Sequence, residues 1–533
     1  MPELTVRALA SGLAVGGLLC VANLYMGLKT GIWDSGHVTA SILAFALASG
    51  RLTRSENNVA QAAATAAGGV PAAAGLLGAI PALELIGRAV PGWGIALWGL
   101  AMAVIGILFG ATLRKRLLEQ EKLPFPTGVA TAEVIEALQK GTSDRTRPLM
   151  WGGVVGAVVG WFRDGKPAVI PAVLSVPGLS TYGIGVSLSP LLWGVGMVVG
   201  LRIALSVLLG SVLGWAVLAP WLVSGPLHVA ANRGAIWNWL SWPGTALLVG
   251  AALVALLQQA GAFAGALRDL RSASFRLQGV LLGLGAALVT VALGKIVFDL
   301  HPLHTALALA VSVLGASVCA RAAGLTDLSP LGPVGQATQA LYGGLAPGQP
   351  AVNIAAGSVV AGDACHGPIL LWSLGAGARH GTSPRSQIKA AIAGSVLGSL
   401  VCAPAYVLLV RAYSLGSARL PAPTGIQWKA MGEVVAQGLS ALPPGALSAV
   451  AAAAAVGIAL AALGRVRWLP SAMAMGIGVL VPVDYAMAFV LGALLVKVFP
   501  ALREKGAVAG AGLIAGDSLV GIAVALLMSF ALL

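Results

Sequence analysis

The sequence predicts an all-α, polytopic membrane protein, on the basis of its composition, its recurring apolar stretches and the glycine and proline inside them. Hydrophobic residues fill 58% of the 533 positions, charged residues only 9%, and the mean hydropathy is +0.91. Soluble domains carry about 25% charged residues, so most of this surface is expected to face lipid. Since a spanning helix needs about 20 apolar residues, the chain has room for roughly 14 to 16 of them.

Hydrophobic stretches recur along the whole chain and leave no room for a sizeable soluble domain. They cover residues 4–28, 37–50, 57–88, 92–113, 148–162, 187–223, 242–267, 277–298, 302–320, 351–377, 387–410, 443–463, 468–500 and 507–532. Several exceed one span or carry proline and glycine in the middle, which predicts broken helices. The first is long enough to span, so we interpret it as the first transmembrane helix rather than a cleaved leader.

The net charge of +14 would favour nucleic-acid binding in a soluble protein. Here the basic residues gather at predicted helix ends, where they set topology and contact anionic lipid headgroups. We therefore expect membrane lipids as partners and no nucleic acid. The clusters predicted to mark the cytoplasmic side are Arg51/Arg54, Arg114–Arg116, Arg145/Arg147, Arg268/Arg271/Arg276, Arg379/Arg385/Lys389, Arg465/Arg467 and Arg503/Lys505. The polar linker 411–440 is then expected to face outward.

This topology leaves two gaps. Between Arg116 and Lys140 the chain returns to the side it left, although 123–138 is too short for a hairpin of two full helices. Between Arg321 and Arg379 one full span is evident where an even number is required. Both gaps predict short or re-entrant elements at membrane depth, over 124–138 and 331–346, a feature typical of transporters.

Internal repeats indicate an architecture built by duplication. GSVLGWAVLAP at 210–220 returns as GSVLGSLVCAP at 394–404, AGDACHG at 361–367 as AGDSLVG at 515–521, and LPFPTGVATA at 123–132 resembles LPSAMAMGIG at 469–478. The three offsets differ, which favours nested duplications of a smaller unit, as in many secondary transporters. We predict an N-terminal repeat half (1–225), a linking helix and cytoplasmic loop (226–275) and a C-terminal repeat half (276–533). Spacings such as Gly152/Gly156/Gly160 predict close helix contacts.

The chain has only 18 acidic residues, so those inside apolar runs are conspicuous. Asp363 and Asp517 each lie mid-segment in an Ala-Gly-Asp-x-x-x-Gly setting, and we predict these two and Asp484 to couple protons. A charged group at that depth costs at least about 2.5–3.5 kcal/mol, so it faces the interior, pairs or titrates. The alternative, compatible role is to cap a half-helix. The other acids in apolar runs are Glu56, Glu84, Glu133, Glu136, Asp299 and Asp327.

Polar residues beside these acids are candidate substrate-binding groups. His366 could relay a proton from Asp363, with a hydrogen-bonded packing histidine as the alternative. Glu56, Asn57 and Gln61 form a polar run after Arg54, in which Glu56 could also be a first-turn acid that complements the helix dipole.

The remaining candidates lie on two other segments. Thr127 and Glu133 belong to the half-helix that begins near residue 124, whose N-terminal amides would attract a substrate carboxylate. Asn23, Tyr25 and Lys29 lie at the end of the first apolar stretch. Arg202 and Lys295 lie within apolar runs and could bind a carboxylate or pair with an acid.

Several motifs are absent from the sequence. It contains no HExxH, Walker A loop, GxSxG, aspartate cluster or haem-spaced histidine pair. Cys20, Cys319, Cys365 and Cys402 lie singly in apolar segments, which predicts small packing residues rather than disulfides or zinc ligands. We expect no catalytic residue, metal ligand or cofactor, and an ion gradient as the energy source.

Six segments, in order along the chain, resemble the oligopeptide transporter superfamily, nearer its yellow stripe-like branch. They are NLYMGLKTG (23–31), LTRSENNVAQ (52–61), LPFPTGVATAEVI (123–135), AGDACHGPILLWSLGAGARHGTSPRSQ (361–387), LPSAMAMGIG (469–478) and GLIAGD (512–517). The resemblance implies about 16 spanning helices and proton-coupled uptake of small peptides or metal chelates. The family's functional positions fall on Thr53–Gln61, Gly362–Asp363 and Gly516–Asp517. After Asp363 the chain has Ala364–Pro368 where plant members have a stretch ending in an acid and a lysine.

The leading hypothesis is a secondary active, proton-coupled transporter of small peptides or peptide-like metal chelates, multi-pass in the cell (inner) membrane. A passive channel is one alternative, and it would conduct without saturation and need no titratable acids. An intramembrane enzyme acting on a lipid-soluble substrate is another, and it would need a convergent nucleophile or metal site. A homodimer stays open as the assembly.

Overall fold

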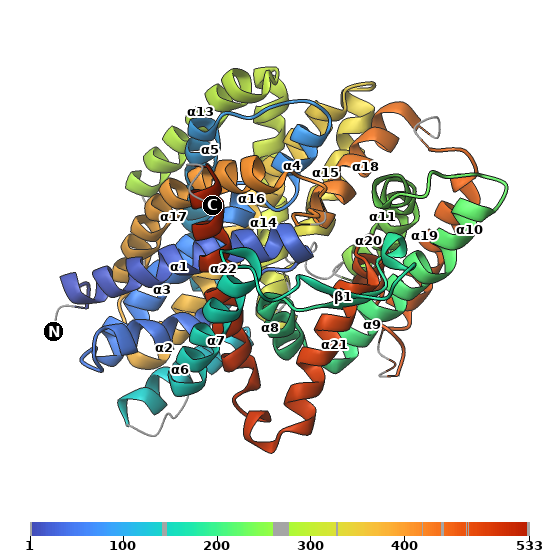
Figure 1. Cartoon of the computed structure of the whole chain (residues 1–533). Coiled ribbons are helices and arrows are strands. Elements are labelled where there is room, and N and C mark those ends of the chain that lie inside the picture. The colour runs from blue at the N-terminus through green and yellow to red at the C-terminus, as the bar shows by residue number, and fades with distance from the viewer. Residues whose placement is uncertain are drawn as a thin grey trace. The chain divides into compact units, whose positions relative to one another are not determined.

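The computed structural model describes residues 3–140, 146–258, 277–326, 329–417, 419–438, 442–464, 466 and 468–529. Within these ranges the chain is all-α (Figure 1) apart from an antiparallel hairpin of β1 (Val173–Ser175) and β2 (Gly185–Ser187). Eight of the described helices are long and apolar enough to cross a membrane. The predicted fold class, a polytopic all-α membrane protein, is confirmed. Predictions on Arg145, Arg268, Arg271, Arg276, Asp327, Arg465 and Arg467 lie outside the described residues.

The helices form two compact units, each assembled from separated stretches of chain. The first unit contains Met1–Leu24, Trp33–Thr146 and Leu256–Val407. Its elements are α1 (Val6–Thr30, whose end belongs to the second unit), α2 (His37–Leu47), α3 (Arg54–Ala73), α4 (Ala79–Leu85), α5 (Gly92–Arg114) with the π-helical turn η1 (Lys115–Gln120), α6 (Pro126–Gln139), α13 (Leu277–Phe298), α14 (Pro302–Thr326), α15 (Leu331–Leu345), α16 (Pro350–His380) and most of α17 (Pro384–Tyr413).

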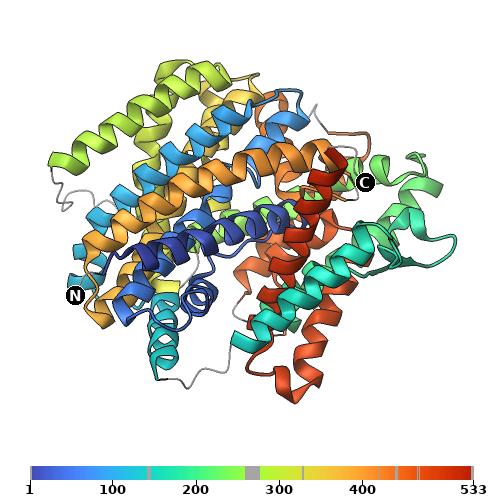
Figure 2. The ribbon, with the colours of Figure 1, turned by 60° about the vertical axis from the view of Figure 1, so that its left-hand side comes forward.

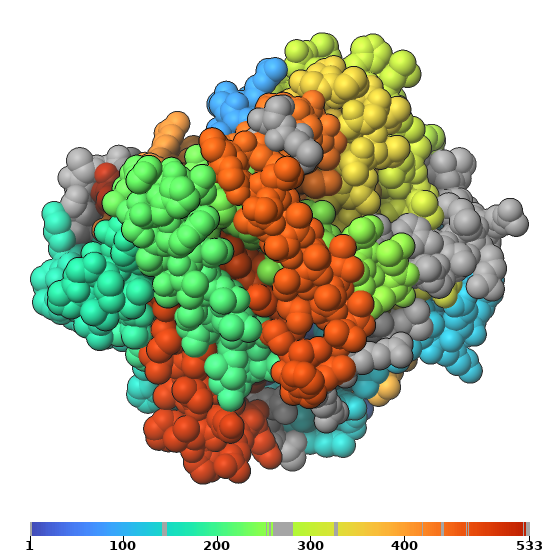
Figure 3. Space-filling model, turned by 90° about the vertical axis from the view of Figure 1, so that its right-hand side faces the viewer, coloured from blue at the N-terminus to red at the C-terminus, as the bar shows by residue number. Residues whose placement is uncertain are grey.

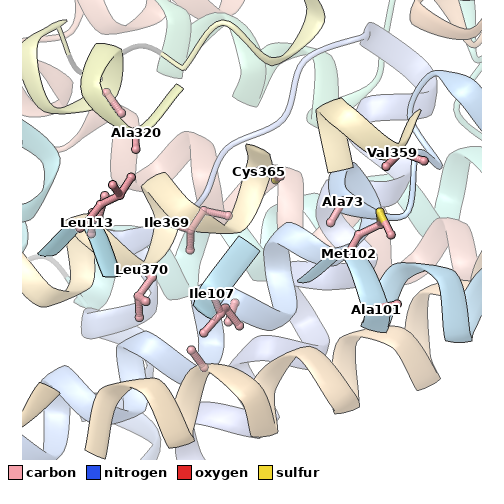
Figure 4. Packing of buried hydrophobic residues seen from close by; sticks show 14 of the residues in the cluster. Ala73, Ala101, Met102, Ile107, Leu113, Ala320, Val359, Cys365, Ile369 and Leu370 are labelled. Carbon is pink, nitrogen blue, oxygen red and sulfur yellow. The ribbon is translucent and has the colours of Figure 1, made fainter. Parts of the chain in front are cut away.

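Helix α16 forms the core of the first unit. It contacts α3, α5, α6, α14 and α15, and nearly all of its residues from 353 to 377 are buried. A helix that is apolar all round is expected to be buried in this way. Its residues Val359, Cys365, Ile369 and Leu370 pack with those of α5, among them Ile107 (Figure 4). Polar groups in the buried middle of this helix therefore lie deep in protein.

The second unit contains Tyr25–Ile32, Arg147–Ala255 and Leu408–Leu533. Its elements are α7 (Thr146–Asp164), β1, the 3-10 turn η2 (Ser180–Tyr182), β2, α8 (Pro190–Val199), α9 (Leu201–Ser211) with the π-helical turn η3 (Val212–Leu218), α10 (Ala219–Ser224), α11 (Arg233–Gln258), α18 (Pro423–Gln437), α19 (Ala446–Ala462), α20 (Ala472–Leu480), α21 (Val483–Val498), η5 (Pro500–Leu502) and α22 (Gly506–Ser529). Figure 3 shows a face where the orange α19 and green segments of α9–α11 reach the surface.

Glycine-faced contacts hold α7 against α22, which run alongside each other in Figures 1 and 2. A Cβ at Gly156 would lie 2.5 Å from the carbonyl oxygen of Leu513, and one at Gly160 would lie 2.6 Å from Oδ1 of Asp517. Only glycine allows two helices to approach this closely. The predicted face of small residues, Gly152/Gly156/Gly160, therefore allows α7 to pack closely against the second Ala-Gly-Asp sequence.

Short helices fill both topological gaps, as predicted. α6 has 14 residues and α15 has 15, fewer than the about 20 that a span requires. The stretch 411–440 differs from its prediction as a polar linker, because 423–437 form α18. Pro423 stands at the first position of this helix, where its fixed φ favours helix initiation, and Trp428 is buried.

Three of the long apolar stretches are broken helices. α3 and α4 are separated at Gly75, whose φ of +73° suits glycine, and α8 and α9 are separated at Gly200, with φ +80°. α20 and α21 are separated at Val481, whose carbonyl accepts a 2.7 Å hydrogen bond from Ser211. Trp215 donates to the carbonyl of Val479, so this break leaves neither carbonyl orphaned.

Each unit holds one copy of each repeated sequence. The two GSVLG copies also pack alike. A Cβ at Gly210 would overlap the carbonyl of Met475 on α20, and a Cβ at Gly394 would overlap that of Ala63 on α3. The units draw residues from both sequence halves, so the division at 1–225 and 276–533 stays a prediction.

Candidate functional site

Asp363 lies in the middle of α16, in the core of the first unit. Its side chain is 1% exposed, and it makes no ion pair with any residue that the structure describes. Oδ1 has no hydrogen-bond partner among those residues. An isolated charge in such a place is costly, because neither water nor a countercharge stabilises it.

The single polar neighbour of Asp363 in the described structure is Ser312 on α14. Its Oγ lies 2.7 Å from Oδ2 of Asp363 and 2.8 Å from the carbonyl oxygen of Leu309. A serine hydroxyl carries one hydrogen, so it can donate to only one of these two acceptors. If Asp363 is protonated, it donates to Ser312 and Ser312 donates to Leu309. The acid hydroxyl, the serine hydroxyl and the Leu309 carbonyl then each have a partner, so the geometry suits a neutral carboxylic acid.

His366, one turn further along α16, does not supply a countercharge. Its Nε2 lies 2.9 Å from the carbonyl oxygen of Ala66, which can only accept, so Nε2 carries a hydrogen. Nδ1 has no partner within the described ranges, and the side chain is fully buried. This is the geometry of a neutral packing histidine that joins α16 to α3.

Asp517 lies at the corresponding position of α22 in the opposite setting. Both of its oxygens accept from the guanidinium of Arg163, at 2.9 and 3.3 Å. Oδ2 also accepts from Ser189 at 2.9 Å and from the backbone N–H of Leu191 at 3.0 Å. Ser189 and Leu191 begin α8, so Asp517 caps this half-helix, which was the alternative role considered for it.

Arg163 has two carboxylate partners, since Asp164 accepts from its Nε at 2.9 Å. The buried ion cluster Asp517–Arg163–Asp164 is therefore fully hydrogen-bonded but carries one surplus negative charge. Removing Asp517 would leave Arg163 with Asp164 as its carboxylate partner in the cluster, and would remove the acceptor of Ser189 and of the N–H of Leu191.

Asp484 belongs to a helix start. It lies in the first turn of α21, where Oδ1 accepts from the N–H of Tyr485, and Oδ2 lies 3.7 Å from the guanidinium of Arg233. The backbone N–H of Asp484 donates to the carbonyl of Gly183 in the hairpin region. An acid in a first helical turn is stabilised by the helix dipole.

Helix α3 presents buried amides towards α16. Gln61 donates to Ser373 at 3.2 Å and to Thr65 at 3.3 Å, and Asn58 donates to the carbonyl of Ser373. Asn57 is fully buried, and neither polar atom of its side chain has a partner among the described residues. These amides form a polar track in the interior of the first unit.

Glu56, at the start of α3, is a capping residue. Its carboxylate accepts from the backbone N–H of Thr53, whose hydroxyl accepts in turn from the N–H of Glu56. It also accepts from Thr5 at 2.7 Å and lies 3.3 Å from Arg7. This reciprocal arrangement is a capping box, so every strong acceptor of Glu56 is already in use.

The half-helix α6 packs its N-terminus closely on α16. Phe125, with φ +42°, precedes the helix, and a Cβ at Gly128 would lie 2.6 Å from the carbonyl oxygen of Trp372. Thr127 is half-buried, and its carbonyl accepts from Thr131. Glu133 is exposed.

The candidates on α1 divide into two groups. Asn23, in the first unit, donates to the carbonyl oxygens of Gly68 at 2.8 Å and Asp34 at 2.7 Å. Its side chain therefore holds these two backbone segments together. Tyr25 and Lys29, in the second unit, are both buried, and the ammonium of Lys29 lies 4.6 Å from the centre of the Tyr25 ring.

Two basic residues predicted within apolar runs lie at exposed positions. Arg202 donates to the backbone carbonyls of Leu469 and Val466 rather than to an acid. Lys295 pairs with Asp299 at 2.6 Å, the alternative expected of a basic residue beside acids.

Within the described ranges, no three His, Cys, Asp or Glu side chains lie close enough together to hold a metal ion. All four cysteines are buried and free, as predicted for packing residues.

The sequence of the whole chain matches a known family. The family model described as OPT oligopeptide transporter protein matches residues 3–279 and again residues 272–528. The chain belongs to the oligopeptide transporter family. The predicted resemblance is thereby confirmed, and membership places the chain among membrane transporters.

Curated members of the family align over nearly the full length of the chain. A Saccharomyces cerevisiae protein whose name proposes an oligopeptide transporter is 23% identical, over 92% of this chain and 90% of its own length. A metal-nicotianamine transporter of Arabidopsis thaliana is 25% identical over 97% of this chain and 92% of its own length. The iron-phytosiderophore transporter yellow stripe 1 of Zea mays is 24% identical over 97% and 89%.

Sequence reasoning missed the partners that distinguish the two aspartates of this family member. Arg163 lies three residues after Gly160, on the same helix face as Gly152, Gly156 and Gly160. This spacing was the available signal that Arg163 would contact α22. Ser312 carries no such signal, because a serine in an apolar helix commonly bonds its own backbone.

Proposed function

We propose that the protein is a secondary active, proton-coupled transporter that carries small peptides or peptide-like metal chelates across the cell membrane. Family membership and the names of its relatives support the substrate class, since these proteins are named for oligopeptides, metal-nicotianamine and iron-phytosiderophore. The observation that carries proton coupling is the buried Asp363–Ser312 pair, an acid without a countercharge in the central helix. Ionisable residues at membrane depth commonly mark ion pathways.

In the proposed mechanism Asp363 is protonated on one side of the membrane and deprotonated on the other. A neutral Asp363 donates to Ser312 and is stable in the apolar core. A charged Asp363 would have only the Ser312 donor, which favours a rearrangement of α14 against α16 that brings water to the carboxylate. The substrate would couple to this step by stabilising one arrangement over the other.

The amide track on α3 suits the substrate backbone. Asn57 offers a donor and an acceptor without a partner among the described residues, and Asn58 offers an acceptor, which matches the peptide groups of a small peptide or a peptide-like chelate. Gln61 already donates to Ser373 and Thr65 and holds this track against α16. Conversely, Glu56 and Asn23 already use their polar atoms within the protein, and they are weaker candidates for direct substrate contact.

The test is uptake by proteoliposomes with an imposed pH gradient. Asp363→Asn keeps the size and the hydrogen bond to Ser312 but cannot release a proton, so gradient-driven accumulation is expected to be lost. Asp299→Asn, which alters an exposed ion-paired acid, is the matched control and should transport normally. Full gradient-driven uptake by Asp363→Asn would refute the proposal, and unsaturable conductance would favour a passive channel.

The cell-membrane location is part of the proposal. It is supported by the family and by the basic helix ends, which suit a cytoplasmic surface next to anionic lipid. Fractionation of cells that express a tagged chain would test it, and recovery with internal membranes alone would contradict it.

A further inference from the structure

Two tyrosines and two cations form a linear cluster in the second unit. The rings of Tyr25 and Tyr413 lie 6.4 Å apart. The ammonium of Lys29 lies 4.6 Å from the Tyr25 ring centre, and the guanidinium carbon of Arg419 lies 5.9 Å from the Tyr413 ring centre. The order Lys29–Tyr25–Tyr413–Arg419 thus leads from a buried cation to an exposed one.

Lys29 is unusual because it is buried without an acceptor. Its side chain is 7% exposed, and its ammonium makes no hydrogen bond and no ion pair with any residue that the structure describes. An ammonium has three N–H donors, and a buried charge is stable only when it is paired and hydrogen-bonded. The contact with the Tyr25 ring offsets part of this cost.

The nearest carboxylates are already committed to another cation. Asp164 and Asp517 both accept from Arg163, and Asp517 also accepts from the start of α8. The charges of Arg163, Lys29, Asp164 and Asp517 cancel, and the exposed Arg419 adds one positive charge. The N–H donors of the Lys29 ammonium still have no acceptor among the described residues, which suits an anionic ligand.

We infer that Lys29 is the inner binding group for a carboxylate of the transported substrate, with Arg419 as an outer contact at the exposed end of the same cluster. This inference rests on the proposed function for its substrate class, and it names the carboxylate as the feature that is recognised. A free peptide carboxylate or an aminocarboxylate chelate fits this pattern, and a ligand without a carboxylate does not.

Lys29 is distinct from the proton site in both location and chemistry. Asp363 belongs to the first unit and is an acid without a countercharge, whereas Lys29 belongs to the second unit and is a cation without an acceptor. Ligand binding at Lys29 can therefore be measured without a proton gradient.

The experiment compares matched ligand pairs by equilibrium binding to purified protein in nanodiscs at fixed pH. The pairs are trialanine with its C-terminal amide, and nicotianamine with its methyl ester. For at least one pair, the wild-type protein should bind the free carboxylate about tenfold or more tightly, the range expected for a charge-assisted hydrogen bond. Lys29→Gln should reduce that ratio to near one, and Lys29→Arg should restore most of it.

The controls separate this inference from proton coupling. Lys389→Gln removes an exposed lysine of the first unit and should keep the wild-type ratio. Asp363→Asn should also keep it, even where gradient-driven uptake is lost. Equal binding of both members of each pair by the wild type, absence of binding included, would overturn the inference. So would a full wild-type ratio in Lys29→Gln.

Discussion

The two Ala-Gly-Asp helices place the same residue in opposite electrostatic settings. On α22, Asp517 accepts hydrogen bonds from Arg163, from a serine hydroxyl and from a helix N-terminus, and all three stabilise its negative charge. On α16, Asp363 meets one serine hydroxyl, and its second oxygen has no partner among the described residues. The difference teaches that one copy of a repeated motif can hold its acid in an ion cluster while the other copy leaves its acid without a countercharge.

The two units also differ in how their buried polar groups are hydrogen-bonded. In the second unit, Ser211 and Trp215 donate hydrogen bonds to the backbone carbonyls at the α20–α21 break. Asp517 accepts from a backbone N–H at the start of α8. The unpartnered buried amides of α3 lie in the first unit. Fully satisfied polar networks make a structure rigid, whereas unsatisfied buried groups are candidates for ligand contact.

The largest expected effect is on folding stability. Asp517→Asn replaces a carboxylate that accepts from Arg163, from Ser189 and from the N–H of Leu191, and a hydrogen bond to a charged group contributes about 1.5–3 kcal/mol. Asp363→Asn keeps a polar group of the same size and removes no ion pair, so we expect a change within about 1 kcal/mol. Thermal unfolding of both variants in the same detergent measures the difference, and equal melting temperatures would contradict the contrast.

The next largest effect on stability is expected at the glycines that contact each aspartate. A Cβ at Gly106 would overlap the carbonyl of Asp363, and one at Gly160 would lie 2.6 Å from Oδ1 of Asp517. Overpacking typically costs about 1–3 kcal/mol, so both glycine-to-alanine variants should melt at lower temperature. Gly285→Ala is the control, because nothing lies within 4 Å of a Cβ there. A control that loses as much stability would count against the close contacts.

A smaller effect is expected at Ser312. Ser312→Ala removes the only described partner of Asp363, and a lost hydrogen bond of about 1 kcal/mol corresponds to roughly a fivefold change in the equilibrium between proton-bound and proton-free forms. The pH profile of uptake should therefore shift, while Ser312→Thr should preserve it. Ser317→Ala, in the same helix but bonded to its own backbone, should leave the profile unchanged. A shift of equal size in that control would refute the pairing.

The smallest effect is expected for a partly exposed ion pair. Glu121 follows the span Gly92–Gln120, and hydrogen bonds from Arg321 at 2.6 and 3.0 Å lower its pKa to about 2. Because the pKa in the folded state lies below the unfolded value of about 4.3, the ionised form stabilises the folded protein. This contribution is complete above about pH 4.3 and is lost as the pH falls towards 2.

Glu121→Gln should therefore cost about 1 kcal/mol at pH 7, the upper end of the range for exposed pairs, because water reaches Glu121 although Arg321 is largely buried. The difference in melting temperature from the wild type should shrink as the pH falls from 5 to 3, and an unchanged difference would contradict the assignment. Compared with Asp517→Asn, this variant shows how much burial adds to the value of an ion pair.

Local patterns in the sequence predicted more of the fold than of the site. The half-helices α6 and α15 followed from counting spans between basic ends, because a bilayer fixes how many residues must cross. The alternative role of Glu56, a first-turn acid, followed from its place after Arg54 at the start of a helix. By contrast, the pairing of Asp517 with Arg163 joins residues 354 positions apart, and no local pattern encodes it.

The different roles of the two aspartates could not be predicted for the same reason. Both stand in the sequence Ala-Gly-Asp, and what separates them is the neighbouring helix, which is α14 with Ser312 in one case and α7 with Arg163 in the other. The direction of Lys29 likewise depends on tertiary contacts, because a lysine in the last turn of a helix usually reaches water.

The most direct test of the account is infrared difference spectroscopy of the protein in lipid as the pH is changed. A protonated carboxylic acid has its own carbonyl stretch, separate from those of carboxylates. We predict that one such band in the wild type is absent from Asp363→Asn and is retained, shifted in frequency, in Ser312→Ala. If Asp363→Asn keeps every protonated-carboxyl band of the wild type, Asp363 does not carry the proton and the central claim is wrong.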